Sequence, residues 1–249
     1  MHNNELMQPL TDALDACASA GQHVDFWLRD DDAVQPSDSL NRLLLLTKKH
    51  EIPVMLAVIP AHSDDKLSQY LARFDHVSVA VHGWSHQNHA PREQKKQELG
   101  EHRSASIVLK ELAYGYEHLS QSYPSAFVPV LVPPWNRISA TIVSGLHPIG
   151  YKALSTFGIN TSTEISMLDT HVDIIDWKGS RGGRDLRELV EEMASCIQDG
   201  SLDTIGLLTH HQVHDSAAWL FLECVFPFLA NHRAARWTSI SSLLVKGRF

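Results

Sequence analysis

The stretch Val24-Asp-Phe-Trp-Leu-Arg-Asp-Asp-Asp32 joins a short apolar run to three consecutive aspartates. Apolar runs of this length are typical of strands that are buried on both faces of a parallel sheet. In such sheets the reactive side chains gather just beyond the carboxyl ends of the strands. The stretch therefore predicts a buried parallel strand that ends in the acidic groups of a site.

Further apolar runs follow along the chain, and segments with a helical pattern separate them. The runs cover residues 53–59, 77–81, 126–132, 152–154, 172–175 and 204–208. The helical patterns cover residues 4–20, 39–50, 64–74, 93–122, 185–199 and 217–230. This alternation predicts an α/β fold, a distorted (β/α) barrel with about seven parallel strands. Because no repeat or linker interrupts the 249 residues, we predict a single domain over residues 1–249.

The charge balance argues against nucleic acid as a partner. The chain has 21 Lys and Arg against 29 Asp and Glu, a net charge of -8, whereas a phosphate backbone requires a basic face. The N-terminal residues lack the pattern of a secretory signal, and no apolar run is long enough to cross a membrane. Three widely spaced cysteines are expected to be free thiols. We therefore expect a cytoplasmic protein that does not bind membranes.

Side chains capable of chemistry follow five of the predicted strands. They are Asp30-Asp31-Asp32, His82-Gly-Trp-Ser-His86, Pro133-Pro134-Trp135-Asn136, Asp176-Trp177 and His210-His211. Since the carboxyl ends of parallel strands lie at one edge of a sheet, these groups are predicted to surround a common site.

His82, His86 and Asp32 suggest a metal site. Imidazole nitrogens and a carboxylate oxygen suit a borderline divalent ion, zinc first, with cobalt, nickel or iron as alternatives. The four-residue spacing of the histidines is weak evidence, because a second such pair, His210 and His214, occurs among 16 histidines. The aspartate cluster strengthens the case for a metal site, since three adjacent carboxylates repel one another without a cation. Asp30 could instead cap the next turn or pair with Arg29.

Between about Val24 and Asp215 these motifs resemble those of the polysaccharide deacetylases (NodB homology, carbohydrate esterase family 4). Asp31-Asp32 matches the paired aspartate of the family, which implies that Asp31 is the general base and Asp32 a metal ligand. His82-Gly-Trp-Ser-His86 matches the His-Ser/Thr-x-x-His motif, which implies that both histidines bind the metal. Gly83 stands where the family has a hydroxyl residue.

Val132-Pro133-Pro134-Trp135 is similar to the third motif, in which an arginine precedes the prolines. In relatives that arginine orients the base. Val132 replaces it here, and the candidates for its role are Arg29, Arg137, Arg181 and Arg184. By analogy, the backbone amide of Trp135 contributes to the oxyanion hole.

Asp176-Trp177 resembles the fourth motif, and Leu207-Leu208-Thr209-His210 resembles the fifth. The resemblance implies that His210, charged by nearby Asp176, is the acid that protonates the leaving amine. His211 is the alternative if the alignment shifts by one residue. Trp177 is either a core residue or a wall of the acyl pocket.

The sequence therefore predicts a metal-dependent hydrolase that removes the N-acyl group of an amino sugar or polysaccharide. One alternative on the same fold is a C–N hydrolase of a small amide, imide or N-formyl group. A second is a non-catalytic carbohydrate-binding homologue. A glycoside hydrolase is a third, because two carboxylates suffice for that reaction, although it has no need of the His82 and His86 pair.

Overall fold

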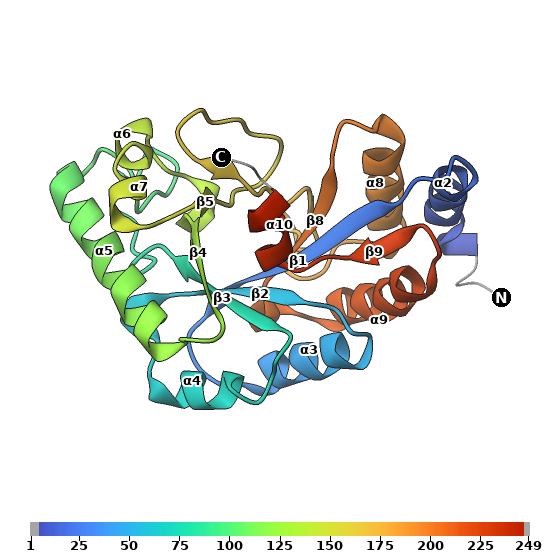
Figure 1. Ribbon diagram of the computed structural model, residues 1–249, viewed down its shortest axis with the longest axis horizontal. Helices are drawn as coiled ribbons and strands as arrows, with labels where there is room; N and C mark the ends of the chain where they lie inside the picture. The colour runs from blue at the N-terminus through green and yellow to red at the C-terminus, as the bar shows by residue number, and fades with distance from the viewer. Residues whose placement is uncertain (1–4, 247–249) are drawn as a thin grey trace. The chain divides into compact units, whose positions relative to one another are not determined.

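The computed structural model describes residues 5–246 and divides the chain into two units (Figure 1). The first unit takes the described residues up to Asp30, together with Ser37–Val54 and Thr170–Ser239. The second takes Asp31–Pro36, Met55–Asp169 and the described residues from Ile240 onward. Strand β1 (Val24–Ala33) therefore contributes to both units.

The first unit is built around β1 and its parallel neighbour β8 (Thr204–Thr209), which are in register from Asp25 opposite Thr204 to Asp30 opposite Thr209. The short strand β7 (Val172–Asp173) pairs with β8, and β9 (Ala235–Trp237) pairs with the start of β1. The helices of this unit are α2 (Gln8–Ser19), α3 (Asp38–Lys49), α8 (Leu186–Asp199) and α9 (Ser216–Asn231). Figure 1 shows α2 beside α8.

Local signals explain where these helices begin. The side chains of Ser37, Asp185 and Asp215 accept hydrogen bonds from the first free backbone amides of α3, α8 and α9. Such caps replace the partners that helical amides lack in the first turn, and each typically contributes about 1 kcal/mol. Helix α8 ends at Asp199 and is capped by Gly200, whose φ of 66° suits a glycine.

In the second unit the strands follow the order β6-β5-β4-β3-β2, and the end of β1 follows β2. They are β2 (Val54–Val58), β3 (Val77–His82), β4 (Phe127–Val132), β5 (Ala153–Leu154) and β6 (Ser166–Met167). The helices are α4 (Asp65–Leu71), α5 (Ala105–Ser122), α6 (Ala140–Val143), α7 (Leu146–Ile149) and α10 (Ile240–Lys246). The pairs β3–β4, β4–β5 and β5–β6 are all parallel.

The predicted α/β class with parallel strands is confirmed. Over the described residues the sheet has nine strands rather than about seven, because β6 and β9 are too short and too exposed to produce an apolar run. The prediction of helix over residues 93–122 is wrong in its first part, since α5 begins only at Ala105 and residues 91–104 form turns and loops. The single domain stays a prediction.

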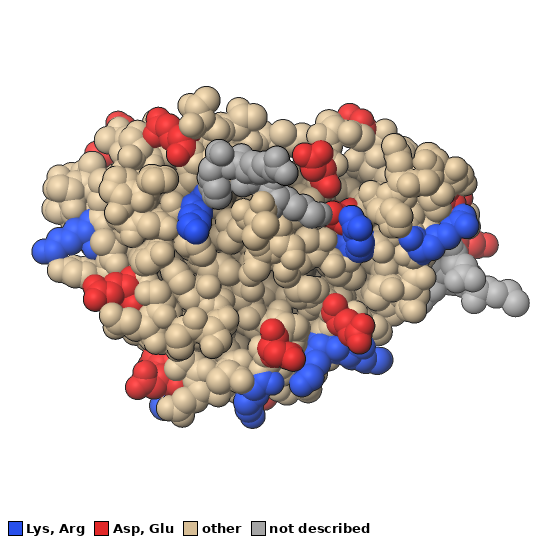
Figure 2. All heavy atoms as spheres, viewed as in Figure 1, with Lys and Arg blue, Asp and Glu red and all other residues tan. Residues whose placement is uncertain are grey.

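Two surface properties bear on possible partners. No helix among residues 5–246 is long and apolar enough to cross a membrane. On the face drawn in Figure 2, acidic and basic side chains are interspersed.

Candidate metal centre

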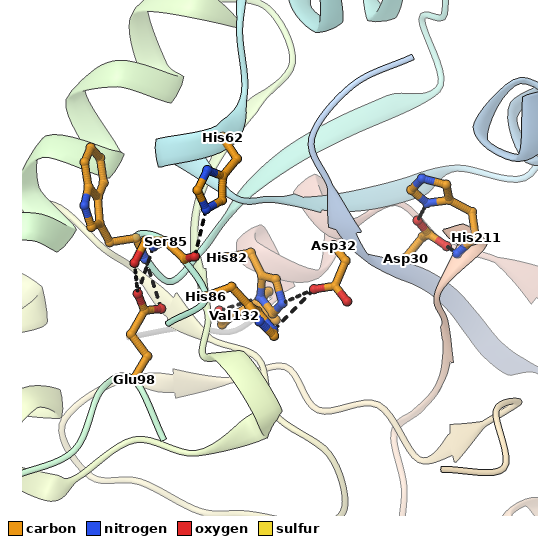
Figure 3. Close-up of polar contacts among 10 residues, drawn as sticks. Asp30, Asp32, His62, His82, Ser85, His86, Glu98, Val132 and His211 are labelled. Carbon is orange, nitrogen blue, oxygen red and sulfur yellow. Dashed lines mark hydrogen bonds and ion pairs between the residues drawn. The ribbon is translucent and has the colours of Figure 1, made fainter. Parts of the chain in front are cut away.

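Asp32, His82 and His86 converge in the second unit, as predicted. Asp32 lies near the end of β1, His82 is the last residue of β3, and His86 lies in the loop after β3. The Nε2 atoms of His82 and His86 are 3.1 and 3.3 Å from Asp32 Oδ1 (Figure 3). One ligand atom from each residue can be chosen so that all three lie within 4.8 Å of one another. Within residues 5–246 no other group of three His, Cys, Asp or Glu side chains comes together closely enough to hold a metal ion.

The hydrogen bond at Nδ1 determines which nitrogen of His82 is available. His82 Nδ1 donates to the carbonyl oxygen of Val132, 2.9 Å away, which also accepts from Gly83 N at 3.1 Å. A carbonyl can only accept, so Nδ1 carries the hydrogen of the neutral ring and Nε2 presents its lone pair. The lone pair points at the carboxylate of Asp32. A metal-binding histidine is usually oriented by such a hydrogen bond to its other nitrogen.

The electrostatics of the cluster favour a cation among these groups. Burial disfavours a charged His82, but the hydrogen bond with Asp32 and the charges of Asp31 and Asp32 outweigh it and raise the pKa of His82. For His86, burial and then the neighbouring His82 lower the pKa, against the opposing charge of Asp32. Two imidazole nitrogens therefore face one carboxylate oxygen. This arrangement is stable only when a proton or a metal ion lies among the three atoms.

The donor set fits a divalent ion of the zinc type. Ligand bonds of about 2.0–2.2 Å in tetrahedral geometry place the donor atoms roughly 3.3 Å apart. The two nitrogen–oxygen distances, 3.1 and 3.3 Å, already match that separation. Three protein ligands also leave a fourth position open, as in catalytic rather than structural sites.

Glu98 supports the loop that carries His86, and the sequence did not reveal it. Its buried carboxylate accepts hydrogen bonds from Trp84 N at 3.2 Å, Ser85 N at 2.8 Å and Ser85 Oγ at 3.0 Å (Figure 3). Glu98 lies in residues 93–104, the first part of the segment that sequence patterning placed in a helix. The sequence feature that pointed to such a residue was Gly83. Because the hydroxyl side chain of the family motif is absent there, another polar group has room to approach.

Gly83 is required by this arrangement. Its φ is +60°, and a Cβ there would overlap the Glu98 carboxylate and lie 2.6 Å from Pro134 Cγ. Glycine is the residue that adopts this backbone region without steric cost. The hydroxyl residue typical of the family motif is therefore excluded at position 83 by the neighbours that this chain places around it.

Trp135 lies against His86 of the candidate metal site in the second unit. Its ring centroid is 4.4 Å from that of His86, and its backbone has a φ of 55°, as does that of Asn136. Positive φ values in consecutive non-glycine residues are uncommon and are often found at functional sites. The predicted use of the Trp135 amide in an oxyanion hole stays a prediction.

Asp31, the predicted base, is almost completely buried, with 2% of its surface exposed. Its charge is among those that raise the pKa of His82, so it lies close to the three ligands. Asp32 itself is partly accessible, with 28% of its side chain exposed.

In the first unit, His210 and His211 have different environments. His211 is buried and binds Asp30 with its ring Nδ1 at 2.5 Å and its backbone amide at 2.8 Å (Figure 3). His210 is only half-buried, and its ring packs edge-on against Trp177 with centroids 4.7 Å apart. His210 is thus the more accessible of the two imidazoles, and His211 forms a buried pair with Asp30.

Asp176 stabilises a turn. Its carboxylate accepts hydrogen bonds from Ser180 N and Gly179 N, both at 3.0 Å, which lower its pKa. Trp177 is 41% exposed, so it is not a core residue, and its indole N–H donates to Asp173 at 2.8 Å. The predicted pairing of Asp176 with His210 stays a prediction, as does the acyl-pocket role of Trp177.

The four arginines considered as replacements for the missing motif-three arginine have different environments. Arg137 donates to the carbonyl oxygen of Lys96 at 2.8 Å, and Arg184 pairs with Glu192 at 2.6 Å. Arg29 is fully buried on β1, two residues before Asp31. Arg181 has a φ of 61° in the turn after Trp177.

Comparison with known proteins gives matches to solved structures. No family model matches the chain, and neither does a curated protein. A putative polysaccharide deacetylase from Mycobacterium smegmatis matches with a TM-score of 0.68 and 14% identity, over 91% of this chain and 90% of that one. A family 4 acetyl xylan esterase from Clostridium thermocellum, in complex with a cobalt ion, matches with a TM-score of 0.58 and 16% identity, over 89% of this chain and 91% of that one.

A third match is a pseudoenzyme of carbohydrate esterase family 4 from Bacillus anthracis, with a TM-score of 0.56 and 14% identity. It covers 90% of this chain and 66% of the pseudoenzyme chain. All three likenesses extend over nearly the whole of this chain. At the level of the fold they confirm the resemblance seen in the sequence motifs: this chain has the fold of the polysaccharide deacetylases of carbohydrate esterase family 4.

Proposed function

We propose that this protein is a metal-dependent hydrolase that removes the acyl group from the nitrogen of an amino sugar. The observation that carries the proposal is the convergence of Asp32, His82 and His86 on one point within the second unit. The fold, shared with deacetylases and an acetyl xylan esterase, is consistent with hydrolysis of an acyl bond.

In this proposal Asp32, His82 and His86 hold a divalent ion, with zinc preferred and cobalt, nickel or iron as alternatives. When bound, such an ion polarises the acyl carbonyl and lowers the pKa of water. Asp31, buried beside the ligands, accepts the proton of the attacking water at its carboxylate. The Trp135 amide is the proposed oxyanion donor, and His210 the proposed acid for the leaving amine.

The non-catalytic alternative is a real one, because a pseudoenzyme is among the structures with this fold. A complete ligand set together with a buried carboxylate beside it favours the enzyme. Hydrolysis of a small amide is the other alternative. The cytoplasmic location expected from the sequence is kept as part of the proposal.

The test combines metal content with turnover. We expect purified protein to bind one equivalent of zinc or cobalt by elemental analysis and to release acetate from N-acetylated chitooligosaccharides. His82→Ala is expected to lose both properties, whereas Asp31→Asn keeps the metal and loses turnover. The exposed His102 of the same unit provides the matched control, His102→Ala, which keeps both.

Each result has a distinct meaning. Full turnover in Asp31→Asn shows that the base is wrongly assigned. Metal binding without release of acetate from any acylated sugar, but with turnover of a small amide, favours the C–N hydrolase alternative. Absence of metal binding in the unmodified chain overturns the proposal altogether.

A further inference from the structure

Residues 59–62 lie between β2 and α4 and contact both segments of the second unit that carry candidate metal ligands. The first contact is at the end of β1, where the backbone amide of Ile59 donates to the carbonyl oxygen of Ala33 at 3.1 Å. Ala33 directly follows Asp32, whose φ of 69° lies in the left-handed region. A non-glycine residue keeps such a conformation only where its surroundings hold it. The hydrogen bond to Ala33 is one contact that fixes the chain beside Asp32.

The second contact is at the loop after β3, and it uses the short 3-10 helix η1 (Pro60–His62). The backbone amide of Ala61 donates to the carbonyl oxygen of Trp84 at 2.9 Å. Nε2 of His62 donates to the carbonyl oxygen of Ser85 at 3.1 Å (Figure 3). Because a carbonyl can only accept a hydrogen bond, Nε2 of His62 carries a hydrogen.

The carbonyl of Ser85 belongs to the peptide group that joins Ser85 to His86. Because a peptide group is planar, a hydrogen bond at its oxygen also fixes the direction of the His86 nitrogen. His86 has a φ of 56°, so it too is a non-glycine residue in the left-handed region. The hydrogen bond from His62 therefore acts on the peptide group next to a candidate ligand with a strained backbone.

Glu98 holds the same loop through the opposite set of backbone groups. It accepts hydrogen bonds from the amides of Trp84 and Ser85, whereas residues 59–62 donate to the carbonyls of the same two residues. All four backbone polar groups of this dipeptide are thus paired within the second unit, by two different parts of the chain (Figure 3). With both edges of the dipeptide held, its peptide planes have little freedom to rotate, and His86 is presented in one orientation.

Packing keeps residues 59–62 in place. Pro60 has no backbone N–H, and its constrained φ suits the first position of a short helix. It is buried and packs against α5 at Gly115, where an added Cβ would lie 3.0 Å from Pro60 Cγ. His62, in contrast, is exposed. A substitution of His62 can therefore remove the hydrogen bond to Ser85 without opening a cavity in the core.

We infer that residues 59–62 form a brace that sets the position of His86 relative to Asp32, and that His62 provides its side-chain donor. This assigns His62 as a positioning residue of the candidate metal site. The inference rests on the proposed function, because it takes Asp32, His82 and His86 to bind an ion. What the site requires at position 62 is an N–H donor rather than an imidazole ring. Glutamine, whose amide also donates, should therefore replace His62, and phenylalanine should not.

The test measures metal affinity and coordination geometry in the full-length protein. Cobalt is the probe, because its visible absorption spectrum reports the coordination geometry, and competition with a chromogenic chelator gives its affinity. His62→Phe is expected to weaken cobalt binding by about 2–10-fold, the usual contribution of one hydrogen bond, and to change the spectrum. His62→Gln is expected to restore both. His102→Phe, at another exposed histidine of the same unit, is the matched control and should behave like the unmodified protein.

The outcomes separate this inference from the proposed function. The brace is overturned if His62→Phe keeps the cobalt affinity and spectrum of His102→Phe, or if His62→Gln loses as much as His62→Phe. It is also overturned if chemical denaturation shows that His62→Phe lowers the unfolding free energy as much as the free energy of cobalt binding, since His62 then acts on general stability. In these cases acetate release by the unmodified enzyme can still support the proposed function.

Two further results concern the proposed function itself. Cobalt binding that depends on His62, without acetate release from any acylated sugar, supports the brace and refutes the deacylation. Absence of cobalt and zinc binding in the unmodified protein overturns both the brace and the proposed function.

Discussion

The carboxylate of Glu98 accepts hydrogen bonds from both the backbone amide and the hydroxyl of Ser85, at 2.8 and 3.0 Å. Ser85 directly precedes the candidate ligand His86. Through this contact Glu98 fixes the loop that carries His86, one of the three groups of the candidate metal site. Groups that orient metal ligands in this way typically change metal affinity by about 10–100-fold when they are replaced.

Glu98→Ala is therefore expected to weaken zinc binding by about 10–100-fold, because the amides of Trp84 and Ser85 lose their acceptor and the His86 loop is no longer fixed. Competition with a chromogenic chelator measures the affinity. Glu93→Ala, at an exposed glutamate of the same segment, is the control and should match the unmodified protein. Equal zinc affinity in Glu98→Ala and Glu93→Ala contradicts the assignment.

Restoring the family's hydroxyl residue at position 83 should damage this protein. Gly83→Ser introduces a side chain at a φ of +60° and against Glu98 and Pro134. The backbone cost alone is about 1–2 kcal/mol. Gly200→Ser isolates that cost, because Gly200 has a φ of +66° and open space around it. Chemical denaturation should show a larger loss of unfolding free energy for Gly83→Ser than for Gly200→Ser. Gly83→Ser should also bind zinc more weakly. Equal losses in the two variants refute the steric argument.

The Asp30–His211 pair is expected to matter for stability. Both side chains are almost fully buried, and Asp30 also accepts from the His211 amide. Removing one partner of a buried pair typically costs about 3–5 kcal/mol, so Asp30→Ala should lower the unfolding free energy by about that amount. The exposed pair of Arg42 and Glu223 offers a comparison in the same unit. Glu223→Gln should cost less than about 1 kcal/mol. A small effect in both variants counts against a stabilising role for the buried pair.

The pH dependence of stability should reveal His214. Burial lowers the pKa of His214 to about 4 from its ordinary value of 6.5, against the opposing charge of Asp30. A histidine with a lowered pKa binds fewer protons when folded, so its contribution to stability is complete above pH 6.5 and falls as the pH decreases toward 4. Between pH 7 and pH 5 the loss amounts to roughly 2 kcal/mol.

Denaturant titrations at the two pH values check this prediction. His214→Gln should lack the corresponding part of the slope, so that the unmodified protein loses roughly 2 kcal/mol more than the variant between pH 7 and pH 5. Parallel pH profiles of the two proteins show that His214 titrates normally in the folded state.

The sequence predicted the strands and the convergence of Asp32, His82 and His86 because both depend on local patterns. A buried strand such as β3 requires a continuous apolar run, and the candidate ligand His82 ends that strand. Glu98 was missed because its partner Ser85 lies 13 residues away, across a loop without periodicity. The separate environments of His210 and His211 were not predictable either, since they depend on Asp30, which is 181 residues from His211.

Finally, the acceptor that orients His82 is the main-chain carbonyl of Val132 rather than a side chain. A substitution at position 132 leaves the main-chain carbonyl in place, so a change of side chain alone does not remove the hydrogen bond that sets the tautomer of His82. This is the position at which the related motif has an arginine. An insertion or deletion within β3 or β4 does disturb this hydrogen bond, because it shifts the alignment of His82 with Val132. The orientation of His82 therefore depends on the alignment of β3 with β4 and not on which side chain stands at position 132.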